Sequence, residues 1–382
     1  MRSRYASAAF ALPATLAVGA ASALLLVGVV SCAVPAFRGF AGLKSESTAP
    51  SWQSTATAPS SSATTGPLEA TPSVAASAAP ASPTPAPVPE PPPPTPAKPF
   101  EVSSALDYIR HLSNEIGVRR GGTAAEARAA TYLLDALRSL GYSDTQIRDV
   151  PLPNGRTSHV VWATKQGTSP DDIVLGAHMD TKSPSPGAND NGSGCGVVLE
   201  LARDLKDATI TPTVTFVFFG TEEMIDHDQD HHHYGSRWFV EHMPADLRRD
   251  VAGMISLDMV GYGGALAVRT MGRGPKGMAN LLKDRFRAAG VQTIYVRDPG
   301  RYGWSDHEPF ELAGIPAAWL EWRGTGGQGS SQLLRDDPVY HTSGDRFSHV
   351  RANPIERTGT TMRAFLLGLG AADLAALKAP RR

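Results

Sequence analysis

From Glu101 onwards, short apolar runs alternate with stretches of helical periodicity, and this alternation restricts the possible folds most. Runs typical of buried strands lie at 173–177, 214–219, 254–257 and 315–320. Helices are predicted at 102–112, 124–140, 196–205, 278–289 and 358–377. Strands that alternate with helices predict an α/β sandwich with a largely parallel central sheet. Binding sites in such folds lie beyond the carboxyl ends of the strands.

Length and charge exclude some classes of protein. The chain has 382 residues, of which 41% are hydrophobic, enough for one large domain with a real core or for two smaller ones. Its formal net charge is −1. This argues against general affinity for nucleic acid, which requires a basic surface, and gives no reason to expect electrostatic binding to acidic membranes.

The first 32 residues have the composition of an export segment. Arg2 and Arg4 precede an uncharged stretch that runs from Tyr5 to Phe37, and residues 21–30 are strongly apolar. The run ends in Val-Val-Ser-Cys at 29–32, which resembles a lipobox and predicts lipidation of Cys32. An uncleaved N-terminal anchor and ordinary cleavage with release are the alternatives. All three place the domain outside the cytoplasm, in or beyond the cell envelope.

Residues 33–99 are predicted to form a disordered stalk that precedes one globular domain at 100–382. From about residue 43 the segment is dominated by Ser, Thr, Ala and Pro, and charged residues are rare. Such a composition buries too little apolar surface to offset the entropy of ordering. The proline-dense part at 87–96 is expected to be extended and semi-rigid.

Acidic residues and histidines stand where the predicted strands end. His178 and Asp180 follow the first run, two residues apart, so their side chains point the same way. A carboxylate bonded to one ring nitrogen fixes the tautomer of a metal-binding histidine. Asp190 lies in the glycine-rich segment 187–194, just before a helix. That segment could be only a turn with a helix cap, but a carboxylate in a rigid loop could also bridge two metal ions.

Two adjacent carboxylates, Glu222 and Glu223, close the second run. Their burial is costly unless positive charge compensates them, and metal supplies that charge. One can bind metal while the other acts as general base on an activated water. Alternatively, both are solvated acids of an exposed loop. Asp258 follows the third run, and His341 stands beside Tyr340 near the C-terminus.

Taken together, these segments resemble the zinc aminopeptidases of metallopeptidase family M28. The matching signatures are H-x-D, N-D-N-G-S-G, E-E, D-M and Y-H-T, with a further S-D-H-x-x-F match at 305–310. The resemblance covers about residues 102–376. It implies a three-layer α/β/α sandwich of the zinc-exopeptidase type, with a largely parallel, mixed central sheet. It also implies removal of N-terminal amino acids from peptides that have a free N-terminus.

The resemblance assigns a role to each matching position. It implies two zinc ions, one held by His178, Asp190 and Asp258 and the other by Asp190, Glu223 and His341. Asp190 therefore bridges the ions, and the peptide bond after it, to Asn191, is expected to be cis. Glu222 matches the general base and acid, and Asp180 matches the partner of a zinc-binding histidine. Tyr340 could donate a hydrogen bond to the oxyanion, as matching tyrosines do in some members.

The chain departs from the family pattern by an insert at residues 226–233, rich in Asp and His. It could bind an extra cation, or be a solvated loop at the mouth of the cleft that favours small substrates. Residues that could line a hydrophobic pocket are Met259, Trp304, Trp319 and Trp322, with core packing the alternative for the two later tryptophans. His307 is expected to be structural, and Cys195 a packed residue. A glutaminyl-cyclase-like single-zinc enzyme and a non-catalytic binding domain are the competing functions.

Overall fold

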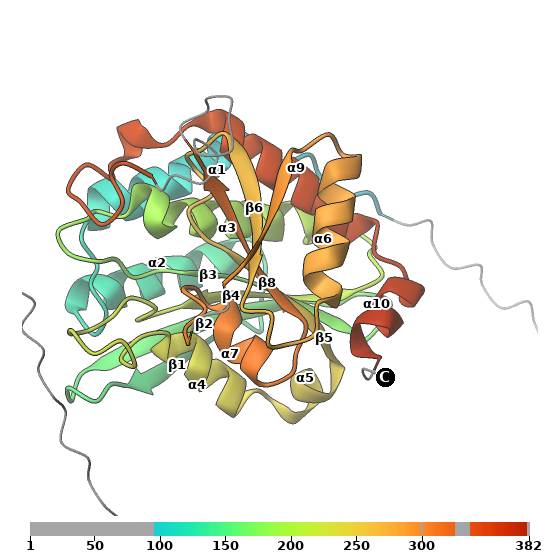
Figure 1. Ribbon diagram of the computed structural model, residues 1–382, viewed down its shortest axis with the longest axis horizontal. Coiled ribbons are helices and arrows are strands. Elements are labelled where there is room, and N and C mark those ends of the chain that lie inside the picture. Colours follow the sequence, from blue (N-terminus) through green and yellow to red (C-terminus); the bar gives the residue numbers. More distant parts are fainter. Residues whose placement is uncertain (1–94, 299–300, 325–336, 380–382) are drawn as a thin grey trace, which may run out of the picture. The chain divides into compact units, whose positions relative to one another are not determined.

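An eight-stranded mixed β-sheet forms the middle layer of the computed structural model, which describes residues 95–298, 301–324 and 337–379 (Figure 1). The strands are β1 Gln146–Pro151, β2 Thr157–Lys165, β3 Asp172–His178, β4 Thr213–Phe219, β5 Val251–Leu257, β6 Ala265–Thr270, β7 Thr293–Arg297 and β8 Ala317–Arg323. Their order is β1-β2-β4-β3-β5-β8-β6-β7. The four central strands β4, β3, β5 and β8 are parallel, whereas β2 and β6 run antiparallel to their central neighbours. The predicted mixed, largely parallel sheet is confirmed.

Helices cover both faces of the sheet, which gives the predicted three layers (Figure 1). One face carries α1 Val102–Arg110, α2 Ala124–Ser139, α3 Gly194–Leu205, α6 Gly277–Ala288, α9 Ala352–Leu367 and α10 Ala371–Lys378. The other carries α4 Tyr234–His242, α5 Ala245–Asp250 and α7 His307–Leu312. On this second face the Phe219 ring packs edge-on against Phe239 and Phe310, with centroids 5.8 and 6.2 Å apart. The rings of Phe239 and Phe310 are tilted against each other, 6.3 Å apart. The sheet is thus buried on both sides, which explains the unbroken apolar runs of β3, β4 and β5.

Two of the predicted elements differ clearly from the structure, and strands β1, β2, β6 and β7 and helices α4, α5 and α7 were not predicted. The last strand begins at Ala317 and continues to Arg323, later than the predicted 315–320. The predicted helix at 358–377 is wrong: α9 ends at Leu367, and α10 begins at Ala371 at an angle of 94°. Gly368 and Gly370 flank the break, and glycine inside a helix costs about 1 kcal/mol relative to alanine. The Asp373 carboxylate accepts the Gly370 N–H at 3.0 Å, which starts the new helix.

The described chain begins inside the predicted stalk. Thr95 and Thr209 exchange hydrogen bonds, Thr209 N–H to the Thr95 carbonyl at 2.9 Å and Thr95 N–H to the Thr209 hydroxyl at 3.2 Å. Lys98 N–H donates to the Asp204 carbonyl at 3.0 Å. The folded body therefore includes residues 95–99, while the predicted anchor and the rest of the stalk lie outside the described residues.

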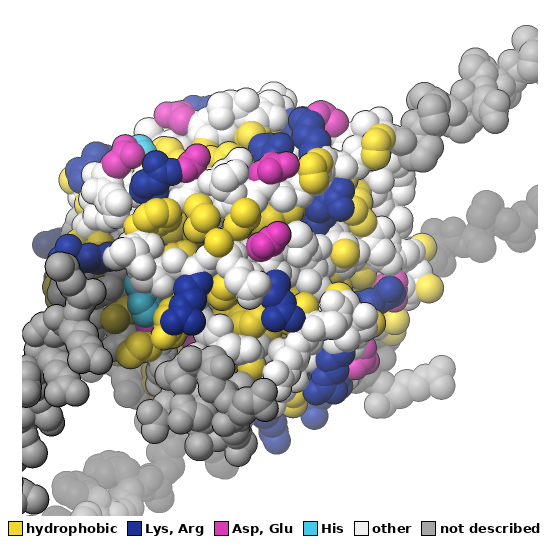
Figure 2. All heavy atoms as spheres, turned by 90° about the horizontal axis from the view of Figure 1, so that it is seen from above, with side chains coloured by type: hydrophobic (Ala, Val, Ile, Leu, Met, Phe, Trp, Pro, Cys, Tyr) yellow, Lys and Arg dark blue, Asp and Glu magenta, His cyan; other side chains and the backbone are white. Residues whose placement is uncertain are grey.

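One face of this body is mixed in charge. Figure 2 shows Lys and Arg side chains interspersed with Asp and Glu on the face that it views, with apolar side chains between them. In the described part of the chain, no single helix is long and apolar enough to cross a bilayer. The bent pair α9 and α10 reaches the length and apolar composition of a membrane span only when both helices are counted together.

Candidate metal centre

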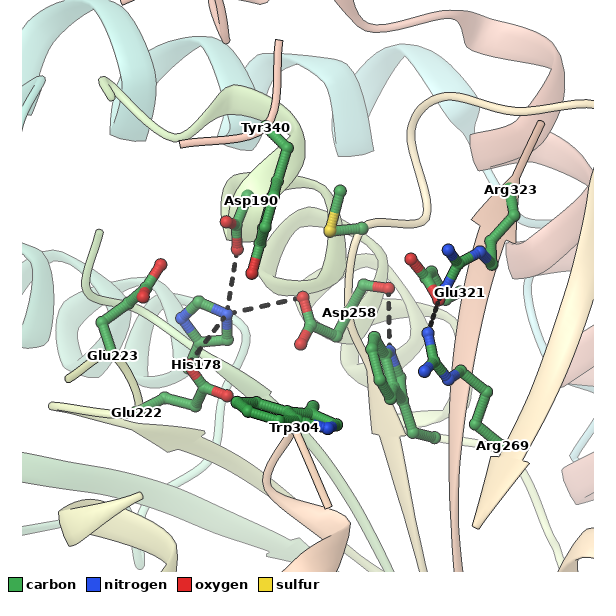
Figure 3. A pocket seen from close by; sticks show the side chains of 12 residues that line it. His178, Asp190, Glu222, Glu223, Asp258, Arg269, Trp304, Glu321, Arg323 and Tyr340 are labelled. Carbon is green, nitrogen blue, oxygen red and sulfur yellow. Dashed lines mark hydrogen bonds and ion pairs between the residues drawn. The ribbon is translucent and has the colours of Figure 1, made fainter. Parts of the chain in front are cut away.

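Three neighbouring parallel strands deliver the first group of polar side chains to one edge of the sheet. His178 is the last residue of β3, Asp258 directly follows β5, and Glu222 lies three residues beyond β4. His178 Nε2 is 3.4 Å from Asp258 Oδ1 and 3.9 Å from Glu222 Oε2. Ligand atoms of all three residues lie within 4.8 Å of one another (Figure 3). The parallel register thus creates a group that could hold one metal ion.

Asp190 connects this group to a second one. It lies in the turn Ala188–Ser193, which leads into α3, and its peptide bond to Asn191 is cis, as predicted. Asp190 Oδ1 is 3.2 Å from His178 Nε2, and Oδ2 is 3.2 Å from His341 Nε2. One carboxylate oxygen therefore faces each histidine, the arrangement expected of a carboxylate that bridges two ions.

The second group consists of Asp190, Glu223 and His341, whose ligand atoms also lie within 4.8 Å of one another. His341 Nε2 is 2.8 Å from Glu223 Oε1. The Tyr340 ring stacks on the His341 ring with centroids 3.6 Å apart, and its hydroxyl points into the pocket (Figure 3). Although Tyr340 is 44% exposed, its hydroxyl points into the pocket that the carboxylates line (Figure 3).

Asp180 was predicted to be the partner of His178, and it contacts the two glutamates as well. Its Oδ1 lies 3.5 Å from His178 Nδ1, close enough to orient the ring. The same carboxylate also accepts the N–H of Glu222 at 3.0 Å and of Glu223 at 3.2 Å. One buried carboxylate therefore lies beside the His178 ring and bonds to the backbone of both glutamates, so the two groups share a common support.

The chemistry of the centre fits a bound cation. Asp190, Glu222, Glu223 and Asp258 are each at most 8% exposed. Burial raises the pKa of Glu222 and of Glu223 because the charged form loses its hydration. Asp258 Oδ1 has no hydrogen-bond partner among the described residues. Four clustered carboxylates with two imidazoles need more positive charge than the protein supplies, and this oxygen and nitrogen donor set suits zinc.

Two supporting residues were not recognised in the sequence. Asp345 accepts the N–H of Asn189 at 2.7 Å and of Asp190 at 3.0 Å, so it holds the backbone at Asp190. Burial is the main reason that the pKa of Asp345 rises to about 7. Arg119 is fully buried and donates to the carbonyls of three loop residues, Met179 at 2.6 Å, Pro186 at 2.6 Å and Gly187 at 2.8 Å. In the sequence, Arg119 is one arginine in a segment without helical or strand periodicity, and nothing marks it as buried.

Replacing Arg119 by leucine is expected to lower the free energy of unfolding by about 3 kcal/mol or more, because each buried carbonyl left without a donor costs roughly 1–3 kcal/mol. Urea unfolding of the purified protein measures the change. Arg128, which is exposed on α2, provides the matched control, and Arg128→Leu should change stability by less than about 0.5 kcal/mol. An Arg119→Leu protein that unfolds at the wild-type midpoint would contradict this account.

The insert is only partly the solvated loop expected from the sequence. Residues 226–230 are exposed, but His232 and His233 turn inward and are at most 3% exposed. His233 Nε2 lies 3.0 Å from Glu222 Oε1. Burial alone would lower the pKa of His233. The neighbouring carboxylates of Glu222 and Glu308 have the larger effect, and the pKa rises to about 10. The exposed residues 226–230 are anchored by a hydrogen bond in which the Tyr302 hydroxyl donates to Asp230 Oδ1 at 2.7 Å.

The aromatic residues divide between the pocket and the core. Met259, Trp304 and Trp319 line the pocket next to the carboxylates. Trp322 does not: it is 2% exposed in the core, and its Nε1–H donates to the Thr358 hydroxyl at 2.7 Å. The predicted alternative of core packing is therefore correct for Trp322.

Two side chains considered in the sequence prove to be packing residues. His307 is fully buried, with its ring centroid 6.0 Å from that of Trp319. Cys195 Sγ donates to the His178 carbonyl at 3.1 Å, and burial raises its pKa to about 12. Cys195 is therefore a packed thiol, as expected.

A family model described as peptidase family M28 matches residues 159–366. Leupeptin-inactivating enzyme 1 of Streptomyces exfoliatus is 28% identical over 68% of this chain, and aminopeptidase YwaD of Bacillus subtilis is 32% identical over 51%. The probable lipoprotein aminopeptidase LpqL of Mycobacterium tuberculosis is 29% identical over 57%. The matched regions span 61%, 40% and 46% of these relatives' lengths, respectively.

Solved structures share the fold. A zinc aminopeptidase from Bacillus subtilis, BSAP, aligns with a TM-score of 0.60 and 21% identity over 70% of this chain and 94% of its own. A glutaminyl cyclase from Bacteroides thetaiotaomicron aligns with a TM-score of 0.59 and 19% identity over 72% of this chain and all of its own. At these identities, the likeness establishes the α/β architecture alone.

Proposed function

The chain belongs to peptidase family M28, and on this premise we propose that it is a zinc-dependent aminopeptidase that removes N-terminal amino acids from peptides. One observation carries the proposal: two groups of metal-binding side chains meet at Asp190, one of its oxygens facing His178 and the other His341. This arrangement supports two zinc ions per chain, bridged by one carboxylate.

The ligands of the proposed centre are His178, Asp190 and Asp258 for one ion, and Asp190, Glu223 and His341 for the other. Glu222 is left as the general base. Its Oε2 faces the centre at 3.9 Å from His178 Nε2, while its Oε1 is held by His233. When bound, the two zinc ions would polarise the scissile carbonyl and lower the pKa of a water molecule at the site.

Protein side chains supply the proton transfers and the orientation. Glu222 takes a proton from the attacking water and delivers it to the leaving amine. The hydroxyl of Tyr340, which points into the pocket, donates a hydrogen bond to the oxyanion that develops on the carbonyl oxygen (Figure 3). Asp180 keeps His178 and the Glu222 backbone in place throughout.

The acidic character of the pocket supports recognition of a free N-terminus. A substrate's α-ammonium group would enter among carboxylates that are buried and close to one another. Trp304, at the rim beside them, and Met259 and Trp319 provide apolar surface for the first side chain. An N-acetylated peptide has no free amine to meet the proposed zinc centre and the acidic rim of the pocket, so N-acetylated peptides should be poor substrates.

The purified protein is expected to release p-nitroaniline from aminoacyl-p-nitroanilides, and to lose most of this activity after chelation. Zinc should restore it. N-acetylated versions of the same substrates provide the matched control and should react at least ~10-fold more slowly. Equal rates on free and acetylated substrates, or full activity in the metal-free protein, would contradict the proposal.

The two competing functions give different results in the same experiment. A glutaminyl-cyclase-like enzyme would hold one zinc ion and release ammonia from peptides that begin with glutamine. A non-catalytic binding domain would hold peptide without turning it over. The complete set of five ligand residues around two groups supports the two-metal peptidase over both.

We further propose that the protein is exported and held at the cell envelope by a lipid on Cys32, as the sequence at 29–32 and a relative described as a lipoprotein suggest. Fatty-acid labelling in growing cells should mark the wild-type protein and fail for Cys32→Ser. Cys195→Ser, which removes the buried thiol, should keep the label. A wild-type protein that stays unlabelled while it is found outside the cells would favour cleavage and release.

A further inference from the structure

We propose that His233, with Glu308 behind it, is a positioning residue that holds the general base Glu222 in its reactive orientation. This inference rests on the proposed function because it gives Glu222 the role of base. It gives a role to His233, the last residue of the insert at 226–233 by which this chain departs from the family pattern.

The His233 ring faces a carboxylate at each nitrogen, with a hydrogen bond at Nε2 and an ion-pair contact at Nδ1. Its Nε2 lies 3.0 Å from Glu222 Oε1, and its Nδ1 lies 3.4 Å from Glu308 Oε2. His233 is 1% exposed and Glu308 is 3% exposed. Glu308 lies on α7, and its carboxylate is held by other segments: its Oε2 accepts the N–H of Gly303, before α7, at 2.5 Å, and its Oε1 lies 3.6 Å from Arg237 on α4. The chain of contacts therefore runs from a fixed carboxylate through the ring to the base.

The backbone also ties His233 to the segment that carries the base. His233 N–H donates to the Glu222 carbonyl at 2.8 Å, and the next residue, Tyr234, donates to the Thr221 carbonyl at 2.8 Å. His233 has a φ of 54°, and Thr221 has a φ of 51°. Positive φ costs a non-glycine residue roughly 1–2 kcal/mol, so it persists only where the surroundings demand it. His232 covers the ring face, with centroids 3.9 Å apart.

These contacts separate the two oxygens of Glu222. Oε1 is directed at His233, away from the ligand group, and Oε2 faces the centre at 3.9 Å from His178 Nε2. A carboxylate with one oxygen held in this way cannot turn both oxygens to a metal ion. It presents a single oxygen to the position from which a proton must be taken, and a misplacement of 1 Å can cost about 100-fold in rate.

A third metal ion is the other reading of the same residues. His232, His233 and Glu308 offer ligand atoms within 4.8 Å of one another, and His232 Nε2 has no hydrogen-bond partner among the described residues. However, the two imidazoles are stacked with an interplanar angle of only 28°. Lone pairs in such nearly parallel planes do not converge on one point. Arg237 also already supplies a cation to Glu308. The geometry therefore favours positioning over metal binding.

Two substitutions of His233 test the proposal. His233→Asn tolerates the positive φ but is too short to reach Glu222, and it should lower kcat by about 10- to 100-fold. KM should change less than about threefold, and the zinc content should not change. His233→Gln, whose amide can still donate to Oε1, should recover part of the lost kcat. His231→Ala, in the same insert, is the control and should match the wild type.

A readout independent of turnover is the position of Glu222 in crystals of the variants. In His233→Asn, with or without zinc, the Glu222 carboxylate should leave its position or occupy more than one rotamer. Glu308→Gln keeps His233 in place and should give a smaller loss of kcat, so it tests the chain of contacts even if His233→Asn fails to fold. An unmoved Glu222 together with unchanged kcat would overturn the proposal, as would loss of one metal equivalent from Glu308→Gln. Lack of peptidase activity in the wild type would instead refute the proposed function, and the crystallographic readout would still stand.

Discussion

Replacement of Glu222 by glutamine should lower kcat by about 10²- to 10⁴-fold without loss of bound zinc, since general acid–base catalysis typically contributes that much. Glutamine keeps the size of the side chain and can still bond to His233, but it cannot accept a proton from water. KM should change little because the neighbouring ligands and the apolar pocket remain. Steady-state kinetics and metal analysis of the same preparation measure both quantities.

Glu223→Gln is the matched control for this prediction. The two glutamates are adjacent and equally buried, and both backbone N–H groups bond to Asp180. Glu223 lies in the group with Asp190 and His341, whereas Glu222, which lies near His178 and Asp258, has one carboxylate oxygen bonded to His233. Glu223→Gln should therefore lose zinc affinity, whereas Glu222→Gln should not. If the two variants lost zinc alike, or if Glu222→Gln stayed fully active, the roles assigned here would be wrong.

The sequence predicted the centre of the fold better than its edges, for a physical reason. Strands β3, β4 and β5 are buried on both faces, so they appear as continuous apolar runs followed at once by polar residues. The outer strand β7 has a half-exposed surface and carries Tyr295 and Arg297. The strand β1 likewise contains Arg148 and Asp149. Neither has a pattern that separates it from a loop.

The positions of His178, Glu222 and Asp258 followed from the same rule, because residues at the carboxyl ends of parallel strands lie at one edge of the sheet. Asp190 and His341 lie in turns, and the resemblance to the family pointed to them. The residues that support the centre could not be found in this way. Arg119 and Asp345 act on backbone atoms of loops far away in the sequence, and no local pattern marks such contacts. His233 appeared as one of several histidines in a polar run, and only the fold shows that it turns inward to Glu222.

Removal of the Asp190 side chain should abolish binding of both zinc ions at once, and this is the sharpest test of a bridged centre. In Asp190→Ala the zinc content should fall from about two ions per chain to near zero, because each group loses a ligand and the bridge that couples them. His341→Ala affects one group alone, so about one ion should remain, held by His178, Asp190 and Asp258. Activity should fall at least ~10³-fold in Asp190→Ala.

Metal analysis after dialysis against a fixed concentration of free zinc compares the variants, and circular dichroism checks that each is folded. The surface variant Asp135→Ala, on the exposed side of α2, is the control for loss of an aspartate and should keep the wild-type zinc content. Retention of one ion by Asp190→Ala would mean that the two sites form independently, each from its own histidine and carboxylate. That outcome would leave the ligand residues in place but remove the bridge, because Oδ1 and Oδ2 of Asp190 would then belong to one ion only.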